Sequence, residues 1–289
     1  MNPQKIIISC DTTIALTKKQ IEEKGYNVIP LNAIVDGVEY HDTVDIDANK
    51  LSDLMRQGAK VSTSTPTIVE IEEYFDNLFE KTNADFIIHF TISSKLSSMF
   101  SLFTRVCEEK YGDKVKVVDS YSICNYIDQE VALATKLANE GHDVDYIINT
   151  VKETLIGTGE IVFIPDSLIY LKRGGRISPA VATIANLIGV IPILCFKDGE
   201  VGKKGVTRTA KKAFLNAIRE WEDTIENFKE NYSLVIMSSD DAVEEKVNKV
   251  AEILKEYAPE MAYFSSRISL NVTAHTGPGT VGLGYMKKN

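Results

Sequence analysis

Short apolar runs alternate with longer amphipathic segments along the first half of the chain. Residues 5–10 and 85–90 are two such runs, and each is followed by polar residues and then by a segment with helical periodicity. Continuous apolar runs of this length are typical of strands buried on both faces of a parallel sheet. The alternation therefore predicts an α/β domain with a doubly wound, largely parallel sheet.

The chain is long enough for two domains of this kind, because 289 residues exceed the usual size of one domain. Gly157 and Gly159 follow the last helical segment of the first half. We therefore expect one α/β domain over residues 1–158 and a second α/β domain over 159–289. The second half has its own strand patterns, two of them joined across Lys197-Asp-Gly199, which is a hairpin signal.

The charge and the apolar pattern narrow the classes of partner. A net charge of -9 without a basic run argues against binding of nucleic acid. No segment approaches 18 consecutive apolar residues, so we expect no integral membrane protein, while transient contact with a membrane stays open. The N-terminus lacks the layout of a signal peptide, and we expect a cytoplasmic location.

The sequence offers no motif for a nucleotide cofactor or a metal. No glycine-rich nucleotide-binding loop is present, neither the dinucleotide fingerprint after the first strand nor a P-loop. The four cysteines are far apart and form no Cys-x-x-Cys pair, so we expect core thiols rather than a zinc site or disulfides. We therefore expect no cofactor and no metal.

Polar residues gather where predicted strands end. The first strand ends in Asp11-Thr12-Thr13, at the edge where open α/β sheets bind ligands. Residues 61–67 carry five hydroxyls in seven positions, and residues 91–98 repeat the pattern after another strand. We place Thr63 just before a helix, where unpaired N–H groups and the helix dipole favour a phosphate or carboxylate.

Helix capping is the alternative explanation for these hydroxyls. Thr65 with Pro66, or Thr67 with Glu70, fits a helix start. Two hydroxyl-rich entrances are harder to explain in this way than one, because each helix needs a single cap.

A histidine lies among glycines near the C-terminus. His275 precedes Gly277-Pro-Gly279, a composition that lets the main chain turn tightly and approach a ligand. Its imidazole can donate a hydrogen bond to an anion, or it is simply solvated in a turn. His89, in contrast, is expected inside a strand, and His41 and His142 on the surface or in loops.

Two groups of cations each have both a functional and a structural explanation. Arg176 follows a glycine pair at a predicted helix end, where positive charge attracts an anion or a partner, or complements the helix dipole. Arg208, with Lys211 and Lys212, is expected to begin a helix, where positive charge opposes the dipole. We therefore expect Arg208 in a partner contact or a salt-bridge network. Residues 180–188 are almost entirely apolar and predict a buried helix that packs tightly or leaves room for a hydrocarbon chain.

Four motifs together make the chain similar to the DegV family of fatty-acid-binding proteins, over essentially its whole length. They are Thr63-Ser-Thr-Pro-Thr67, Ile92-Ser-Ser-Lys-Leu-Ser97, Tyr170-Leu-Lys-Arg-Gly-Gly-Arg-Ile177 and His275-Thr-Gly-Pro-Gly279. The resemblance implies two α/β domains with a fatty acid between them. It also implies that Thr63, Ser93 or Ser94, and the His275 neighbourhood hold the carboxylate.

The resemblance also implies a role and a partner. Some members of the family present the bound acid to a separate ATP-dependent kinase, so we expect a carrier rather than an enzyme, with Arg176 supporting the ligand and Arg208 docking the kinase. The sequence departs from the family pattern at Ser98-Met99 and at Ile191, so the acyl chain that it prefers does not transfer. Two alternatives stay open: an acyl-transfer or hydrolytic enzyme with Ser94 as nucleophile and His275 as base, and a protein that acts through protein contacts alone.

Overall fold

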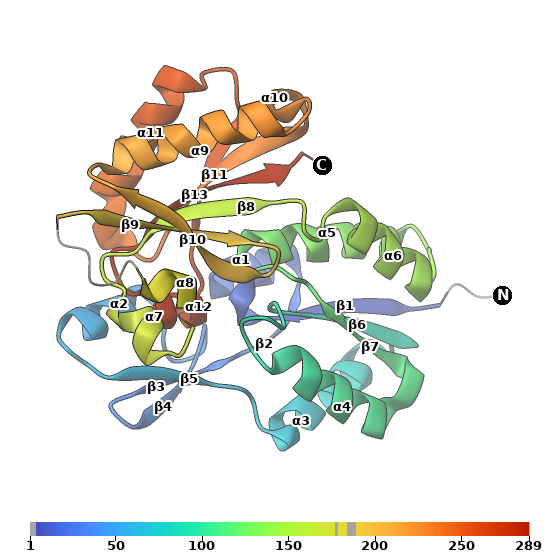
Figure 1. Cartoon of the computed structure of the whole chain (residues 1–289). Helices are drawn as coiled ribbons and strands as arrows, with labels where there is room; N and C mark the ends of the chain where they lie inside the picture. Colours follow the sequence, from blue (N-terminus) through green and yellow to red (C-terminus); the bar gives the residue numbers. More distant parts are fainter. Residues whose placement is uncertain (1–3, 177–178, 184–188, 289) are drawn as a thin grey trace. The chain divides into compact units, whose positions relative to one another are not determined.

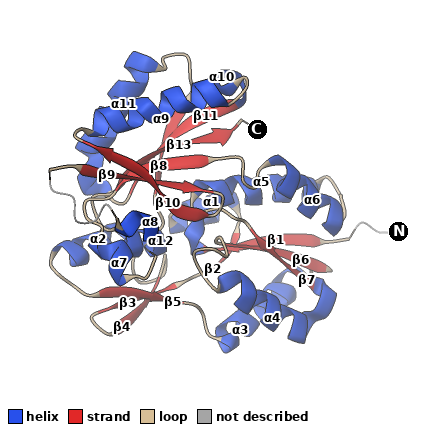
Figure 2. Cartoon of the chain, in the orientation of Figure 1, coloured by secondary structure: helices blue, strands red, loops and turns tan. Residues whose placement is uncertain are grey.

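The computed structural model describes residues 4–176, 179–183 and 189–288, and it shows an α/β chain (Figures 1 and 2). The chain divides into two compact units. Unit 1 comprises residues 1–47 and 61–157, and unit 2 comprises residues 48–60 and 158–289. A single boundary between residues 158 and 159 therefore leaves out one segment, 48–60, whose helix α2 (Ala48–Arg56) packs against α12 (Leu270–Thr276) of unit 2.

The central sheet of unit 1 is parallel throughout, as the apolar runs predict. Its strand order is β2-β1-β6-β7. The strands are β1 (Ile6–Asp11), β2 (Asn27–Ile29), β6 (Phe86–Thr91) and β7 (Val115–Asp119). Side chains such as Ile87, Ile88 and Phe90 are fully buried. His89 is also fully buried within β6, as expected, and stacks on Phe103.

Helices cover both faces of this sheet. They are α1 (Lys18–Lys24), α3 (Ile68–Thr82), α4 (Met99–Tyr111), α5 (Asn125–Asn139) and α6 (Val144–Thr154), with short 3-10 turns at Thr12–Ile14 and Gly112–Lys114. In Figure 1, α5 and α6 lie on one side of the sheet and α3 and α4 on the other. Thr17 and Thr67 each form a capping box, with Gln20 and Glu70, which fixes where α1 and α3 begin.

Unit 1 also contains a small antiparallel sheet that the sequence did not predict. Its order is β4-β3-β5, with β3 (Asn32–Val35), β4 (Val38–His41) and β5 (Val61–Ser64). Asp36 and Gly37 form the hairpin turn between β3 and β4, with φ angles of 49° and 87°. The strands have four residues each, and β4 and β5 are partly exposed, so they lack the apolar run that marks a buried strand.

Unit 2 is built on a mixed six-stranded sheet. Its order is β10-β9-β8-β13-β11-β12, and β11 and β12 are its parallel pair. The strands are β8 (Glu160–Ile164), β9 (Ile191–Lys197), β10 (Glu200–Thr207), β11 (Tyr232–Ser238), β12 (Tyr263–Arg267) and β13 (Val281–Lys287). Asp198 and Gly199, with φ angles of 51° and 82°, form the expected hairpin turn between β9 and β10.

The helices of unit 2 also lie on two sides of their sheet. Besides α2 and α12, they are α7 (Ile169–Arg173), α8 (Pro179–Ala182), α9 (Ala210–Thr224), α10 (Phe228–Asn231) and α11 (Glu244–Tyr257), with a 3-10 turn at Asp241–Val243. In Figure 1, α9, α10 and α11 lie on one side and α7, α8 and α12 on the other. Of the apolar helix expected over 180–188, the structure describes only the α8 part, and residues 184–188 lie outside the described residues.

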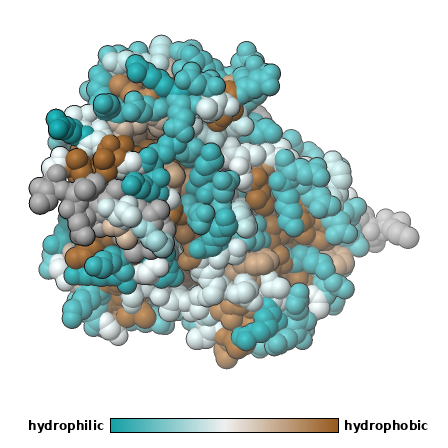
Figure 3. All heavy atoms as spheres, in the orientation of Figure 1, coloured by the Kyte–Doolittle hydropathy of each residue, from teal (hydrophilic) through white to brown (hydrophobic). Residues whose placement is uncertain are grey.

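The main core of unit 2 lies between the sheet and the helices α9 and α11. Trp221 and Phe214 of α9 are 1% exposed and pack with Leu283 and Tyr285 of β13. The indole N–H of Trp221 donates to the buried carboxylate of Glu160 at 3.2 Å. The outward faces of α9 and α11 are largely hydrophilic (Figure 3), which is typical of amphipathic helices packed on a sheet.

Candidate functional site

His275 lies in the last turn of helix α12, and not in a glycine turn as the sequence suggested. The Ser269 hydroxyl caps this helix by accepting from Val272 N at 3.4 Å. The helix ends where Gly277, with a φ angle of 90°, donates its N–H to Thr273 O at 2.8 Å. The tight turn therefore starts two residues after the histidine.

Three glycines let two segments of unit 2 approach each other closely. A Cβ atom on Gly174 would overlap the ring of His275, and one on Gly277 would overlap the ring of Tyr170. A Cβ atom on Gly279 would overlap the carboxylate of Asp166. Glycine is therefore needed at these three positions, because any side chain there would overlap a residue of the other segment.

The surroundings of His275 keep its ring neutral. Burial lowers the pKa of His275 to about 4, and the positive charge of Arg176 contributes to this shift. Arg176 Nη1 donates to the carbonyl of Gly174 at 2.6 Å, so the guanidinium is tied to the backbone on which the histidine packs. A neutral imidazole and a guanidinium can each donate hydrogen bonds to an anion.

A network of hydrogen bonds holds the end of the 275–279 segment at Gly279. Lys246 Nζ donates to Asp166 Oδ1 at 2.5 Å and to the Gly279 carbonyl at 2.9 Å. Gly279 N donates to the hydroxyl of Ser239 at 3.0 Å. Sequence reasoning did not identify these supporting residues, because they are separated along the chain and carry no motif.

The buried carboxylate of Asp240 connects this network to helix α2. Arg56 Nη2 donates to Asp240 Oδ1 at 2.6 Å, and the Asp240 side chain is 2% exposed. Burial by itself raises the pKa of Asp240, but hydrogen bonds from Ser239 and Arg56 outweigh this effect and bring the pKa below its ordinary value. This ion pair is one physical reason why residues 48–60 belong to unit 2.

Thr63 lies on strand β5 of the small sheet in unit 1. It is half-buried and stands opposite Ala33 of β3. The sequence placed it at a helix entrance, but α3 starts at Ile68, with Thr67 rather than Thr65 as its cap. Thr63 is therefore not at a helix N-terminus, because the strand continues to Ser64 before the chain reaches the capping box.

Ser93 and Ser94 form a turn between β6 and α4. Ser93 is fully buried, donates its N–H to Ser122 O at 3.1 Å, and accepts from Lys95 N at its hydroxyl at 3.3 Å. Ser94 is exposed, and its N–H donates to Asp119 Oδ1 at 3.0 Å. Helix α4 begins only at Met99, so these hydroxyls also precede the helix rather than cap it.

This turn lies at the carboxyl edge of the parallel sheet, beside the buried carboxylate of Asp11. Asp11 accepts from Thr13 N at 2.8 Å and from Ile92 N at 3.2 Å, and burial raises its pKa. The chain continues from β1 to β2 on one side and later adds β6 and β7 on the other side, so the strand order of the sheet reverses at the edge between β1 and β6. Ligands of open α/β sheets bind at such points.

The segment between β7 and α5 approaches the same edge with an unusual backbone. Tyr121 and Cys124 have φ angles of 52° and 53°, although neither is glycine. Cys124 N donates to Thr13 O at 2.9 Å, which connects this segment to the end of β1. Such backbone conformations cost energy and concentrate at functional sites.

Arg208 is exposed and lies between β10 and α9. The sequence placed it at the start of a helix, but the helix begins at Ala210 and Thr209 caps it by accepting from Lys212 N. Lys211 pairs with Glu256 at 3.0 Å and lies over the ring of Tyr257. Of the two explanations for the cations at this helix start, a partner contact or a salt-bridge network, Lys211 thus fits a salt bridge.

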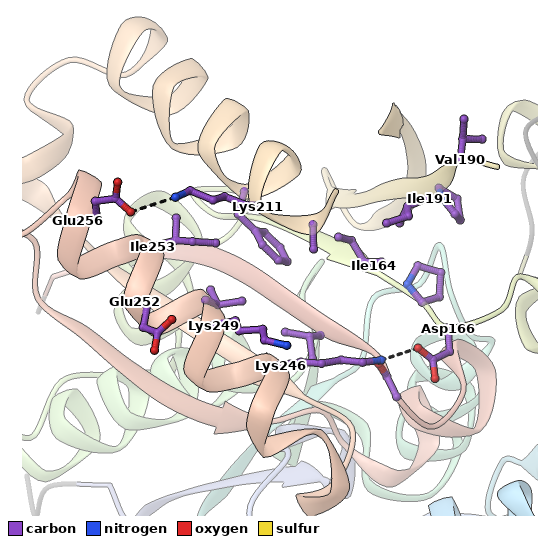
Figure 4. Close-up of a pocket in the computed structure, with 17 residues that line it drawn as sticks. Ile164, Asp166, Val190, Ile191, Lys211, Lys246, Lys249, Glu252, Ile253 and Glu256 are labelled. Atoms are coloured by element: carbon purple, nitrogen blue, oxygen red, sulfur yellow. Dashed lines mark hydrogen bonds and ion pairs between the residues drawn. The ribbon is translucent and has the colours of Figure 1, made fainter. Parts of the chain in front are cut away.

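Unit 2 contains a cavity of about 660 Å³ between α9 and α11 (Figure 4). Its lining is mostly apolar and includes Ile164, Pro165, Ile191, Pro192, Phe214 and Ile253. Three lysines border it, and each is paired: Lys211 with Glu256, Lys246 with Asp166 and Lys249 with Glu245. Neither His275 nor Arg176 lines this cavity.

The described helices do not include one that is long and apolar enough to span a membrane. The four cysteines are all free, and Cys10, Cys107 and Cys124 are buried, as expected for core thiols. Cys195 is only partly buried.

A family model described as an uncharacterised protein of the DegV family matches residues 5–288. A DegV domain-containing protein of Clostridium perfringens is 30% identical over 284 residues, which cover 96% of this chain and 98% of that protein. One from Caldanaerobacter subterraneus subsp. tengcongensis is 29% identical over 286 residues, covering 99% and 100%.

Solved structures have the same fold. A DegV family protein of Thermus thermophilus, described by its fatty acid binding, superposes with a TM-score of 0.84 at 26% identity and covers 99% of this chain and 100% of its own. DegV of Bacillus subtilis, described as a fatty acid binding protein, superposes with a TM-score of 0.82 at 25% identity, with coverage of 99% and 100%.

Proposed function

Since the chain belongs to the DegV family, we propose that it binds a long-chain fatty acid. The observation that carries this proposal is that His275 and Arg176 both lie against Gly174, whose carbonyl accepts from the guanidinium and whose backbone packs on the imidazole. Burial keeps the histidine neutral, and the guanidinium beside it supplies the positive charge that a carboxylate needs. The relatives from Thermus thermophilus and Bacillus subtilis, which are described as fatty-acid-binding proteins, support this assignment.

The carboxylate contacts are proposed from the sequence motifs. His275 donates from its neutral ring, with Arg176 in support, and the hydroxyls of Thr63 and of Ser93 or Ser94 donate from unit 1. The fatty acid then lies between the two units. Hydroxyl and imidazole donors bind a carboxylate reversibly, because none of them forms a covalent bond with it.

The acyl chain supplies most of the affinity. Burying a methylene contributes about 0.8 kcal/mol. About ten buried methylenes then contribute roughly 8 kcal/mol before the cost of association, which is enough for tight binding.

We place the headgroup at His275 and not at the cavity between α9 and α11. A carboxylate in that cavity would compete with Asp166, Glu245 or Glu256 for the lysine that each one pairs with. Ala210 is exposed and lines the cavity, so Ala210→Trp partly fills it without entering the core. This variant is expected to bind fatty acid with the affinity of the parent protein.

We further propose that the protein is a cytoplasmic carrier in lipid metabolism, and not an enzyme. In this role it presents the bound carboxylate to a separate ATP-dependent kinase, which forms the acyl phosphate. The exposed Arg208 is the residue to which we assign contact with the kinase.

Extraction of the purified protein followed by mass spectrometry tests the proposed function. We expect about one long-chain fatty acid per chain, and rebinding of a fluorescent fatty acid after the lipid is removed. His275→Ala with Arg176→Ala should weaken rebinding while leaving the circular dichroism spectrum unchanged. A protein that neither carries fatty acid nor rebinds it would refute the proposal, and turnover of an acyl ester abolished by Ser94→Ala would instead favour the hydrolytic alternative.

A further inference from the structure

Three side chains with metal-binding atoms meet on the small sheet of unit 1. Glu39 and His41 lie on β4, and Glu70 lies in the first turn of α3. One ligand atom from each of them lies within 4.8 Å of the others. The hairpin turn at Asp36-Gly37 places β4 beside β3, and the cap at Thr67 starts α3 where its first carboxylate faces this strand.

The capping box fixes one carboxylate of this group. Glu70 Oε2 accepts from Thr67 N at 2.6 Å. Glu70 Oε1 points the other way and lies 3.9 Å from His41 Nε2. One oxygen of Glu70 is therefore used by the helix start, and the other lies near the histidine. The side chain of Asn32, which pairs with His41 in the sheet, also forms a hydrogen bond with this carboxylate.

Asp45 orients the imidazole of His41. Its Oδ1 accepts from His41 N at 2.6 Å, and its Oδ2 lies 3.3 Å from His41 Nδ1. With the proton on Nδ1, donated to Asp45, the lone pair of Nε2 is directed toward Glu70. Metal-binding histidines have this arrangement, in which a carboxylate holds the ring nitrogen that faces away from the metal.

The charge around His41 is negative on three sides. Glu39, Asp45 and Glu70 surround one imidazole, and within the described residues no lysine or arginine forms a salt bridge with any of these carboxylates. A bound cation would relieve the repulsion among them.

This group is distinct from the proposed carboxylate site. In the register of the small sheet, His41 pairs with Asn32, and Asn32 pairs with Ser64. Thr63 pairs with Ala33, one position along, and neighbouring residues of a strand point to opposite faces. His41 and Thr63 therefore lie on opposite faces of the sheet.

We propose that Glu39, His41 and Glu70 bind a zinc ion, with Asp45 positioning His41. One imidazole and two carboxylates suit zinc, whereas calcium and magnesium prefer oxygen ligands alone. Tetrahedral zinc with bonds of about 2.1 Å sets its ligand atoms about 3.4 Å apart. Glu39 is exposed on β4 and can rotate to close the remaining distance, and water takes the fourth position.

Zinc at this site would connect β4 to the first turn of α3. The segment between β5 and α3, which follows Thr63, would then be held at both ends. Because the metal binds the folded state, its binding should raise the midpoint of thermal unfolding.

Competition with a chromogenic zinc indicator tests the site in the full-length protein after its tag is removed and metals are stripped with EDTA. We expect the parent protein to take up one zinc ion at this site. His41→Ala should weaken it by on the order of 100-fold or more, because loss of an outer partner alone costs about 10- to 100-fold. Asp45→Asn should fall in that smaller range. Glu70→Gln removes a charged ligand but keeps the capping box, since glutamine also closes one.

His142→Ala is the matched control. His142 has a side chain 38% exposed, against 40% for His41, and its Nε2 lies 3.7 Å from a single carboxylate, that of Glu140. This variant should bind zinc like the parent. The four cysteines are unchanged in all variants, so zinc bound by thiols cancels in the comparison.

Two results would overturn the zinc site. One is a parent protein whose thermal midpoint and indicator signal do not respond to zinc. The other is a His41→Ala variant that stays folded by circular dichroism and binds zinc as tightly as the parent or as His142→Ala. Both outcomes leave the fatty-acid proposal untouched, because the two sites share no residue.

Discussion

The ring of His275 packs on the backbone of Gly174 so closely that a Cβ atom on the glycine would occupy the same space. The two residues come from separate motifs of unit 2, and Arg176 donates a hydrogen bond to the carbonyl of the same glycine. The position of the His275 ring therefore depends on Gly174 having no side chain, as well as on the residues around the ring.

Gly174→Ala should destabilise the protein and weaken fatty-acid binding. Gly174 has a φ angle of -75°, so the backbone accepts alanine and the cost comes from overlap with the His275 ring. We expect about 1–3 kcal/mol of lost stability in urea unfolding, the range typical of overpacking.

A double-mutant cycle separates this contact from a general effect. In the His275→Ala background the ring is gone, so Gly174→Ala should cost much less than in the parent. Equal costs in both backgrounds would show that the contact does not set the cost.

Stability should depend on the charge of His275 between about pH 4 and pH 6.5. The unfolded state takes up a proton near pH 6.5, whereas burial lowers the pKa of the folded state to about 4. The unfolded state binds more protons in this window, so stability is full above pH 6.5 and falls as the pH decreases toward 4. The contribution is at most about 3 kcal/mol.

Comparison with His275→Gln isolates this contribution. The pKa of the buried His89 is also lowered, to about 3, so the parent protein alone would report both histidines. The difference in unfolding free energy between parent and variant, measured in urea at pH 7, 6 and 5, should shrink as the pH falls. A difference that is constant with pH contradicts the assignment.

Thr63→Ala and Ser94→Ala should each weaken fatty-acid binding by about 1–3 kcal/mol, the value of a hydrogen bond to a charged group. Ser94 is the cleaner probe, because the hydroxyl of Ser93 also accepts from Lys95 N within the turn. Titration with a fluorescent fatty acid measures the affinity, and circular dichroism verifies the fold. Parent-like affinity in the double variant would remove these hydroxyls from the site.

Arg208→Ala should leave fatty-acid affinity unchanged and slow phosphorylation of the bound acid by a cognate kinase. Arg208 is exposed, so its charge acts on association, and the defect should decrease as salt is added. Acyl phosphate formation at several carrier concentrations and ionic strengths measures the effect. Arg219→Ala, an exposed arginine on α9, serves as control. Loss of ligand binding in Arg208→Ala, or a parental rate throughout, would contradict the docking role.

The sequence identified those elements whose signal is local. Strands such as β1 and β6 are continuous apolar runs because both faces of a parallel sheet are buried. Strand β13 escaped prediction although it lies inside its sheet, since Gly282 and Gly284 interrupt its apolar pattern. Strand β12 ends at Arg267 and the Ser269 cap starts α12 two residues later, a change from strand to helix that no glycine or proline marks in the sequence.

The residues of the candidate sites also divide into those that a local motif identifies and those that only the folded structure brings together. Motifs led to His275 and Arg176, whereas their contact through Gly174 depends on packing that no local pattern records. The sequence did not predict the proposed zinc ligands for a related reason. Glu70 is separated from Glu39 and His41 by a helix and a strand, so their spacing matches no metal-binding motif.

The segment 48–60 has a consequence for dissecting the protein. The chain passes between the two units at three points rather than one, so no single cut separates them. A fragment that starts at residue 158 would keep all six strands of its sheet, but the buried carboxylate of Asp240 would lose the guanidinium of Arg56. Limited proteolysis between residues 157 and 158 should therefore yield two pieces that stay associated, whereas the same pieces expressed separately should fold poorly.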